Sequence, residues 1–284
     1  MYDAIYERVH VSPASITFND TVNIRRTQTF TITNNGESIV SYEITNIQSA
    51  SVHPYDDSQK YVFAEPATLG SDGAKMRFSQ KTIKIAPGTN ASITVTVMPP
   101  ETDPELHVMY GGYIHLKNTV SNQKDITLPY IGIVGNQRDL PIFGNESPIL
   151  SDTTDNNVTY TEENPLTYNR SDSNTQPAIG LSLITPSKLI EFRLYDDNEQ
   201  ELGLAMEHST YNYRATSDDP YIAVAWDGTY RDPSVGFMTK KENPPKTDVA
   251  PGVYRISVRA LKLLGDANSA KDWEVWTSSP ITVV

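Results

Sequence analysis

The stretch that decides the fold is "TQTFTITNNGESIVSYEITNI", residues 27–47. On both sides of "NNGE" (34–37), apolar or aromatic residues alternate with polar ones, and many are β-branched. Alternation with period two is typical of strands that have one buried and one exposed face. Asn and Gly tolerate the positive φ angles that tight turns require. The stretch therefore predicts two strands joined by a short turn.

Segments with the same alternation extend over residues 9–135, and a second turn is expected at "APGTN" (86–90). The predicted strands are residues 9–18, ending in "SITF", then "TQTFTITN" (27–34), "VSYEITNI" (40–47), "KMRFSQKTIKI" (75–85), "ASITVTVMP" (91–99), "GGYIHL" (111–116) and "DITLPYIGIVG" (125–135). No convincing helix separates them, which argues against a parallel sheet built from βαβ units. The pattern predicts an antiparallel β-sandwich of the immunoglobulin or fibronectin type III kind.

Residues 138–177 are polar and interrupted by prolines, which predicts a loop-rich, poorly packed opening segment with one strand near residues 158–160. Strand patterns then resume at "AIGLSLI" (178–184), "LIEFRLYD" (189–196), "ELGLAM" (201–206), "YIAVAW" (221–226), "GVYRISVRAL" (252–261) and "SPITVV" (279–284). We therefore expect two sandwiches in tandem, residues 9–137 and 138–284.

Composition excludes several classes of function. The net charge is −12, with 23 basic residues scattered among 35 acidic ones, which argues against nucleic-acid binding. No apolar run approaches the roughly 18 residues that span a bilayer, so no membrane association is expected. There is no cysteine for a disulfide or a thiolate site. Asp3, Glu7 and Arg8 interrupt any apolar run near Met1, so we expect no signal peptide in this chain.

Candidate glycosylation sites are consistent with secretion, although their number is close to chance for this composition. The N-x-Ser/Thr acceptors are Asn19, Asn90, Asn145, Asn157 and Asn169.

No cofactor or metal is predicted. Glu105, His107 and His115 are the nearest approach to a metal cluster, but ordinary surface histidines are the preferred interpretation. "SDTTDNN" (151–157) has the composition of a calcium loop, although metal-free loops of this kind are far commoner.

The tryptophans allow two interpretations. Trp226, Trp273 and Trp276, with 16 tyrosines, have the chemistry of a sugar-stacking platform. If "DWEVWTS" (272–278) is a strand, however, Trp273 and Trp276 lie on its opposite faces. Core packing or a domain interface is therefore preferred.

Three longer stretches share motifs with one known family: "MYDAIYERVHVSPASITFNDT" (1–21), "YGGYIHLKNTVSNQKDITLPYIGIVG" (110–135) and "RALKLLGDANSAKDWEVWTSSPITV" (259–283). They resemble the C-terminal fibronectin type III-like region of secreted fungal subtilisin-like serine proteases of the Vpr or lactocepin-like group. In "MYDAIYERVHVSPASITFNDT" (1–21), residues 2–5 match the end of the last helix of the catalytic domain, and "VSP" and "NDT" match the strand that follows it. "YGGYIHLKNTVSNQKDITLPYIGIVG" (110–135) is similar to the family's Y-x-G-x-I strand and its closing L-x-V-P-Y-x-G-x-x-G. "RALKLLGDANSAKDWEVWTSSPITV" (259–283) resembles its terminal R-A-L…G-D…D-Y-E-x-W-x-S-P.

The resemblance implies that residues 1–8 are the remnant of a catalytic-domain helix, with Tyr2, Ile5 and Trp276 as candidate interface residues. Subtilisin-like proteases place their catalytic residues in D-S/T-G, H-G-T and G-T-S-M/A. None of these motifs occurs here, so no catalytic residue is carried over and the chain itself is not expected to be an enzyme.

The implied role is therefore that of a non-catalytic accessory region of a subtilisin-like serine endopeptidase. Its partner would be the missing protease domain of the same parent chain, which it would stabilise while framing the substrate cleft. Protein substrates would be contacted indirectly, and the parent would be extracellular. The alternative is a free-standing cell-surface or extracellular module that binds polysaccharide or protein.

Overall fold

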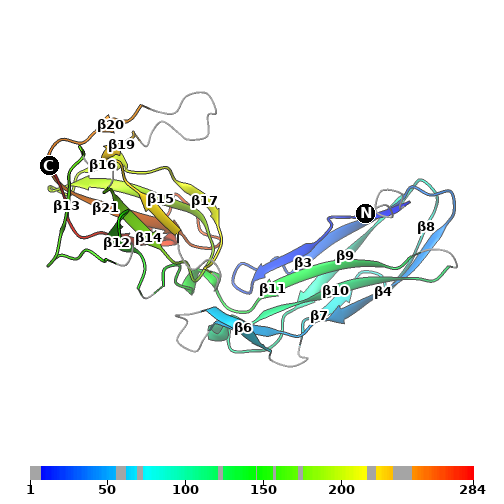
Figure 1. Cartoon of the computed structure of the whole chain (residues 1–284). Helices are drawn as coiled ribbons and strands as arrows, with labels where there is room; N and C mark the ends of the chain where they lie inside the picture. The colour runs from blue at the N-terminus through cyan, green and yellow to red at the C-terminus, as the bar shows by residue number, and fades with distance from the viewer. Residues whose placement is uncertain are drawn as a thin grey trace. The chain divides into compact units, whose positions relative to one another are not determined.

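The computed structural model describes residues 8–55, 62–68, 73–120, 124–144, 146–155, 158–171, 175–215, 222–232 and 245–284. Within these residues the chain consists of strands and three short 3-10 helices, and it contains no α-helix. Contacts divide the chain into two compact units, Met1–Ser58 with Glu65–Gln137, and Gln59–Ala64 with Arg138–Val284 (Figure 1). The predicted all-β class with two sandwiches in tandem is confirmed.

The first unit is a sandwich of two sheets, ordered β1-β3-β9-β7 and β2-β11-β10-β4-β8, with β5 paired to β10 and β6 paired to β5. Its elements are β1 (Val9–Ser12), β2 (Ile16–Asp20), β3 (Thr27–Asn34), β4 (Val40–Gln48), β5 (Val52–Tyr55), β6 (Val62–Thr68), β7 (Lys75–Phe78), β8 (Thr82–Ile85), β9 (Asn90–Met98), η1 (Pro104–Leu106), β10 (Met109–Asn118) and β11 (Ile126–Ile133). Strand β2 runs parallel to β11, whereas the pairs of β3 with β1 and β9, of β10 with β4, β5 and β11, of β4 with β8 and of β7 with β9 are antiparallel.

Strand β3 shows how the alternation produces this sandwich. Phe30 and Ile32 are fully buried in the core, while the threonines between them face outward. On the outer face, the hydroxyl groups of β3 pair across the sheet with those of β9, with oxygen–oxygen distances of 3.0–3.3 Å. Such cross-strand pairs on one face and apolar packing on the other fix the register of the two strands.

The "NNGE" turn connects the two sheets, because β3 and β4 lie in different ones. Asn34 is fully buried, and its side-chain amide donates to the backbone oxygens of Ser38 and Ile85 while its Oδ1 accepts from the N–H of Gly36. The expected positive φ occurs at Gly88 (68°) in the second turn and not at Gly36. The turn is therefore shaped by the buried side-chain amide of Asn34, and it does not use the positive φ that glycine allows.

Two predicted strands are each divided in the structure, and these predictions were wrong. Residues 9–18 form β1 and the start of β2, and residues 75–85 form β7 and β8; in both cases the two halves belong to different sheets. Pro13 has no N–H for a ladder and lies at the first break. At the second, Ser79 donates its backbone N–H to the Thr94 oxygen beyond the end of β7. Strands β5 and β6 were not predicted.

The end of the first unit is fastened to the end of β2. The buried Asp20 carboxylate accepts the backbone N–H groups of Asn23 at 2.6 Å and Gln137 at 3.0 Å. The Thr21 hydroxyl and the backbone of Gly135 exchange hydrogen bonds of 3.1 and 2.9 Å. Gly135 has φ 98°, and a Cβ there would lie 2.2 Å from the Pro104 oxygen.

This geometry predicts different costs for two glycine substitutions. Gly88 also has positive φ but open space around its missing Cβ. Gly88→Ala should therefore cost about 1 kcal/mol of unfolding free energy, whereas Gly135→Ala should cost about 3 kcal/mol or more, because strain and a clash add. Urea denaturation of the two variants measures the difference, and equal destabilisation would contradict the packing of Gly135 against Pro104.

The second unit has a three-stranded sheet β12-β14-β18, a large sheet β13-β23-β21-β15-β16 with β17 on β15 and β22 on β21, and a β19-β20 pair. Its elements are η2 (Gln137–Asp139), β12 (Ile149–Asp152), β13 (Leu166–Tyr168), β14 (Pro177–Leu181), β15 (Ser187–Asp196), β16 (Glu201–Leu204), β17 (Ser209–Asn212), β18 (Ile222–Ala225), β19 (Thr229–Tyr230), β20 (Thr247–Asp248), β21 (Gly252–Leu261), η3 (Ala270–Asp272), β22 (Trp273–Thr277) and β23 (Ile281–Val283). Each of the six predicted strands after residue 177 overlaps an observed one, and four of them contain it entirely.

The two units share one feature of topology. In each, the second strand runs parallel to the last strand, β2 with β11 and β13 with β23. The first strand of each pairs antiparallel with the third, β1 with β3 and β12 with β14. The opening strands thus contribute to both sheets of each sandwich.

The opening segment of the second unit is better packed than predicted. Leu140, Ile142 and Leu150 are buried, because they belong to or adjoin the second hydrophobic core. The strand expected at residues 158–160 is absent, and β12 and β13 form on either side of it. Tyr160 instead donates its backbone N–H to the Leu150 oxygen.

Asp152 lies in the segment 151–157, for which a metal-free loop was the preferred interpretation, and its carboxylate accepts hydrogen bonds from its own chain. Its carboxylate accepts from the backbone N–H groups of Thr154 and Asp155 and from the hydroxyl groups of Thr154 and Tyr160. Burial would raise the pKa of Asp152, but these hydrogen bonds outweigh it and lower the pKa from 3.8 to about 2. Tyr160 responds in the opposite sense, and its pKa rises to about 12.

Asp152 should therefore make the second unit sensitive to acid. Because its folded pKa lies below the unfolded value, its contribution is complete above about pH 4 and is lost as the pH falls through about 2. Asp152→Asn should lose about 2 kcal/mol of unfolding free energy at neutral pH and almost none near pH 2, as followed by chemical denaturation. Glu37→Gln, at an exposed carboxylate, is the control. A difference between wild type and Asp152→Asn that is independent of pH would contradict this account.

Candidate functional site

The three tryptophans do not form a common platform. Trp226 is fully buried in the second core, where its indole N–H donates to the Thr229 oxygen at 2.7 Å. Tyr168 and Tyr254 pack against its ring, with centroids 6.1 and 6.2 Å away. A ring in this position stabilises the sandwich and cannot stack on a sugar.

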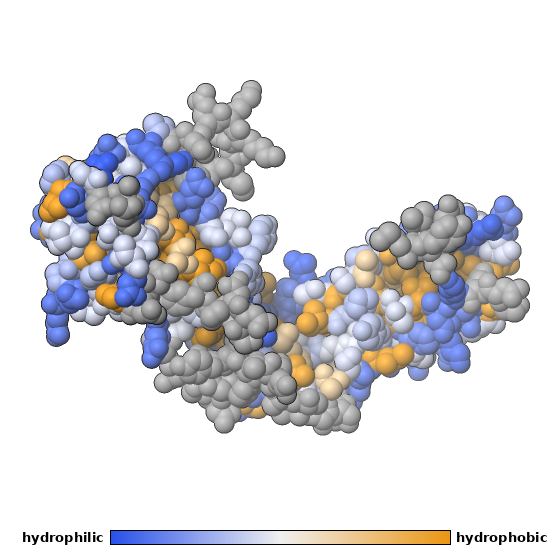
Figure 2. Space-filling view, viewed as in Figure 1, coloured by the Kyte–Doolittle hydropathy of each residue, from blue (hydrophilic) through white to orange (hydrophobic). Residues whose placement is uncertain are grey.

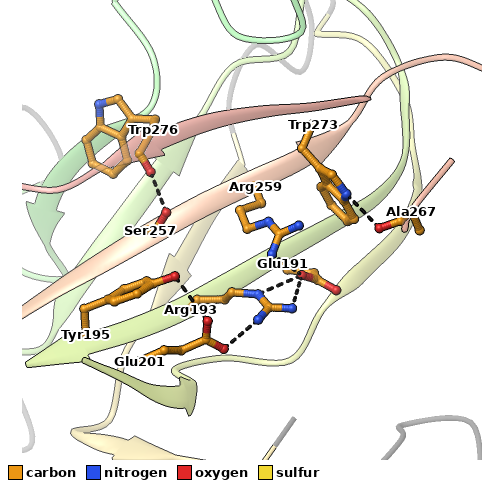
Figure 3. Close-up of polar contacts among 9 residues, drawn as sticks. All are labelled: Glu191, Arg193, Tyr195, Glu201, Ser257, Arg259, Ala267, Trp273 and Trp276. Carbon is orange, nitrogen blue, oxygen red and sulfur yellow. Dashed lines mark hydrogen bonds and ion pairs between the residues drawn. The ribbon is translucent and has the colours of Figure 1, made fainter. Parts of the chain in front are cut away.

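Trp273 and Trp276 lie on opposite faces of β22, as predicted. Trp276 pairs with Val258 and packs at the edge of the second core, although it is only half-buried. Trp273 is on the outer face yet 7% exposed, because the Arg259 guanidinium covers its ring at 4.4 Å. Its indole N–H donates to the Ala267 oxygen (Figure 3). The candidate interface residue Trp276 therefore packs in part against the core.

The outer face around Trp273 carries a compact charge cluster (Figure 3). Arg193 lies between Glu191 and Glu201, at 2.9 and 2.5 Å from their carboxylates. Burial acts to lower the pKa of Arg193, but the two glutamates outweigh it and raise the pKa. Arg259 is 3.9 Å from Glu191 and the Tyr195 hydroxyl donates to Glu201. Two cations and two anions neutralise one another, so the cluster supports the sheet and offers no free acid or base.

A groove of about 500 Å³ adjoins this face. Its lining combines Tyr195 and Val275 with Arg255, whose guanidinium is held by Glu162 at 3.0 Å. Three acidic residues, Asp196, Asp197 and Glu199, also line it.

Glu274, in the terminal motif, joins β22 to the opening segment. Its two carboxylate oxygens accept the backbone N–H groups of Ile142 at 2.6 Å and Phe143 at 3.1 Å. Ser278 lies beyond it and exchanges hydrogen bonds with the backbone of Ile256. Sequence reasoning did not identify Glu274. The available signal was its position two residues before Trp276, which places a carboxylate on the core side of β22.

The two histidines of the suspected metal cluster make different contacts. His107 is buried, and its two ring nitrogens are each 3.0 Å from a backbone oxygen, of Glu105 and Asn136. Neither ring nitrogen is therefore free to bind a metal. The Nε2 of His115 is 3.1 Å from Asp125 Oδ2 on an exposed face. Among the residues that the structure describes, no three His, Cys, Asp or Glu side chains are grouped to hold a metal ion.

The glycosylation and interface candidates differ in how exposed they are. Asn90 and Asn169 are exposed, whereas Asn19 is half-buried with φ 60° and donates its side-chain amide to the Asn23 oxygen. Glycosylation therefore stays a prediction, with Asn90 and Asn169 the more accessible acceptors. The other candidates, Tyr2, Ile5, Asn145 and Asn157, lie outside the described residues.

The first unit exposes an apolar group on the outer face of its larger sheet. Tyr113 lies opposite Ile47 on one neighbouring strand and opposite Pro129 on the other. Ile131 lies two residues beyond Pro129, on the same face of the sheet. Tyr113, Ile47 and Ile131 are 46%, 47% and 43% exposed. We call these four residues the Tyr113 patch. Exposed apolar side chains lie among polar ones on the visible face of both units (Figure 2).

Comparison with known proteins gives one match, which lies within the first unit. Residues 16–131, from β2 to β11, match the family model of the Fn3-like domain. The match supports an Fn3-like region in this part of the chain. The Tyr113 patch and the N-D-T motif at the end of β2 both belong to it. No curated protein matches the chain in sequence.

Among solved structures, this chain is similar to a chaperone–tip adhesin complex of CFA/I fimbriae biogenesis, at 9% identity and TM-score 0.34, covering 96% of this chain and 100% of that chain. The CupB2 chaperone of Pseudomonas aeruginosa has 5% identity and TM-score 0.30, with 95% and 99% covered. A PapD-like domain of human CEP192 has 13% identity and TM-score 0.31, with 45% and 84% covered.

No helix among the described residues is long and apolar enough to cross a membrane.

The Glu274 contact can be tested by substitution. Glu274→Ala leaves the N–H groups of Ile142 and Phe143 without their acceptor and should lower the unfolding free energy of the second unit by about 2–4 kcal/mol. Glu274→Gln keeps one acceptor oxygen and should lose about half as much. Val275→Ala, at an exposed neighbour, is the matched control for urea denaturation. Equal, small losses in all three variants would contradict this role.

Proposed function

We propose that the chain is the non-catalytic accessory region of a subtilisin-like serine endopeptidase, which stabilises the protease domain and frames its substrate cleft. An Fn3-like domain fits an accessory or binding module. The observation that carries the finer proposal is the combination of that domain with the resemblance of residues 1–21, 110–135 and 259–283 to the C-terminal region of these proteases.

The partner in this proposal is the protease domain of the same parent chain. The Tyr113 patch supports docking, because apolar groups exposed together on a sheet face favour contact with another protein surface. The exposed acceptors Asn90 and Asn169 are compatible with an extracellular parent. In this role the chain contacts protein substrates only through the cleft that it frames.

A binding module for polysaccharide is the competing function, and the geometry of the tryptophans does not favour it. Trp226 is in the core, Trp273 lies under Arg259 and Trp276 packs at the core edge. Retention of the chain on an insoluble polysaccharide, lost in Trp276→Ala, would nevertheless support that function over ours.

The coding sequence upstream of Met1 tests the proposal directly. We expect an in-frame segment that encodes Gly-Thr-Ser-Met, the family's serine motif. A stop codon with its own promoter before Met1 would contradict the proposal. The purified chain should neither hydrolyse casein nor react with a serine-directed fluorophosphonate, and turnover by it would overturn the non-catalytic role.

Docking is tested in the full-length parent. Tyr113→Asp should shorten the half-life of protease activity on heating several-fold, because a charge in an apolar interface is destabilising. Thr29→Asp, which adds the same charge to the exposed face of the other sheet, should have little effect. Both variants of the isolated chain should unfold at similar urea concentrations. Equal half-lives of the two parents would contradict docking through the Tyr113 patch.

A further inference from the structure

The second unit contains a cavity of about 270 Å³ between β16, β18 and β19. Aliphatic groups of Leu204, Met206, Val224 and Ala225 form much of its lining, and Arg231 and Lys246 contribute positive charge. The volume is just below the usual range for ligand sites and suits a molecule of only a few heavy atoms. The cavity is independent of the accessory role proposed above.

Arg231 is held firmly at the wall of this cavity. Its backbone N–H and oxygen form a pair of hydrogen bonds with Leu204, of 2.9 and 2.8 Å. Gly203 lies against the same strand, and a Cβ there would be 2.3 Å from the Arg231 oxygen. The base of the Arg231 side chain therefore has a fixed position next to the cavity.

The guanidinium of Arg231 is not satisfied. Its side chain is 11% exposed, and its Nη1 is buried without a hydrogen-bond partner. The Glu207 carboxylate lies 3.8 Å from Nη1, which is within ion-pair range but too long for a hydrogen bond. A buried charged donor without an acceptor is costly, and natural structures rarely retain one without a reason.

The other charges at the cavity are already paired. Asp227 accepts from the Thr229 hydroxyl and backbone N–H and from the Lys246 ammonium group. Burial would raise the pKa of Asp227, but these contacts outweigh it and lower the pKa. Arg231 is thus the group at the cavity with unused donor capacity. Glu207 is 65% exposed, so its side chain can turn toward water and leave that donor accessible.

We propose that this cavity binds a small carboxylate with a short aliphatic tail, whose carboxylate takes the place of Glu207 at Arg231. Guanidinium–carboxylate geometry favours two parallel N–H···O bonds. The aliphatic tail would lie against Leu204, Met206 and Val224. Glu207 acts as a competitor from the chain itself, which keeps the positive charge compensated when no ligand is bound.

The test uses the whole chain and sodium butyrate, followed by amide chemical shifts at constant ionic strength. Butyrate should shift the amides of residues 204–207 and 229–231 with millimolar affinity, whereas butyramide, which lacks the charge, and inorganic phosphate, which lacks the tail, should not. Arg231→Gln should weaken butyrate binding about tenfold or more, as expected for loss of a charged hydrogen bond. Glu207→Gln should strengthen it several-fold, because the competing carboxylate is removed.

Arg77→Gln, an exposed arginine on β7 of the first unit, controls for the loss of one positive charge and should leave binding unchanged. If Arg231→Gln fails to fold, Arg231→Lys and Glu207→Gln decide the matter, since a lysine keeps the charge without the bidentate geometry. Equal shifts with butyrate and butyramide, or binding that Glu207→Gln leaves unchanged, would overturn the proposal.

Discussion

In each sandwich, one carboxylate accepts hydrogen bonds from backbone N–H groups in the segment where the first unit ends and the second begins. Buried Asp20 accepts from Gln137, and half-buried Glu274 accepts from Ile142 and Phe143. These N–H groups lie outside the strands, so the sheets cannot supply their acceptors. Because unsatisfied backbone donors away from water are costly, each sandwich depends on its carboxylate to close. The end of the first unit and the first core residues of the second unit are fixed in this way.

Much of the fold could be predicted from alternation alone, and its failures have a physical cause. Strands such as β3 and β9 are buried on one face, so period two identified them. In residues 9–18 and 75–85 the inward positions switch between odd and even numbers where the chain changes sheet, and the prediction overlooked this change of phase. β12 and β13 are short and lie among prolines and polar residues, and their stability comes from pairing with β14 and β23, distant in sequence.

The candidate site was less predictable than the fold. The opposite faces of Trp273 and Trp276 followed from their spacing, but the burial of Trp273 depends on Arg259, whose position in space no local pattern reveals. The motif residues that carry the resemblance, among them Asp20, Gly135, Glu274 and Ser278, serve the interior of the sandwiches. These residues indicate the fold and carry the resemblance to a family. Groups that are exposed or incompletely paired, such as the Tyr113 patch and Arg231, are where binding has to be sought.

Amide hydrogen exchange tests the central role of the two carboxylates most directly. The N–H groups of Gln137, Ile142 and Phe143 lie outside regular strands and would exchange quickly if they met water. Our account predicts that they exchange as slowly as the neighbouring strand amides. Of these three amides, Asp20→Ala should release only Gln137, and Glu274→Ala should release Ile142 and Phe143. Fast exchange of these three amides in the unmodified chain would contradict it.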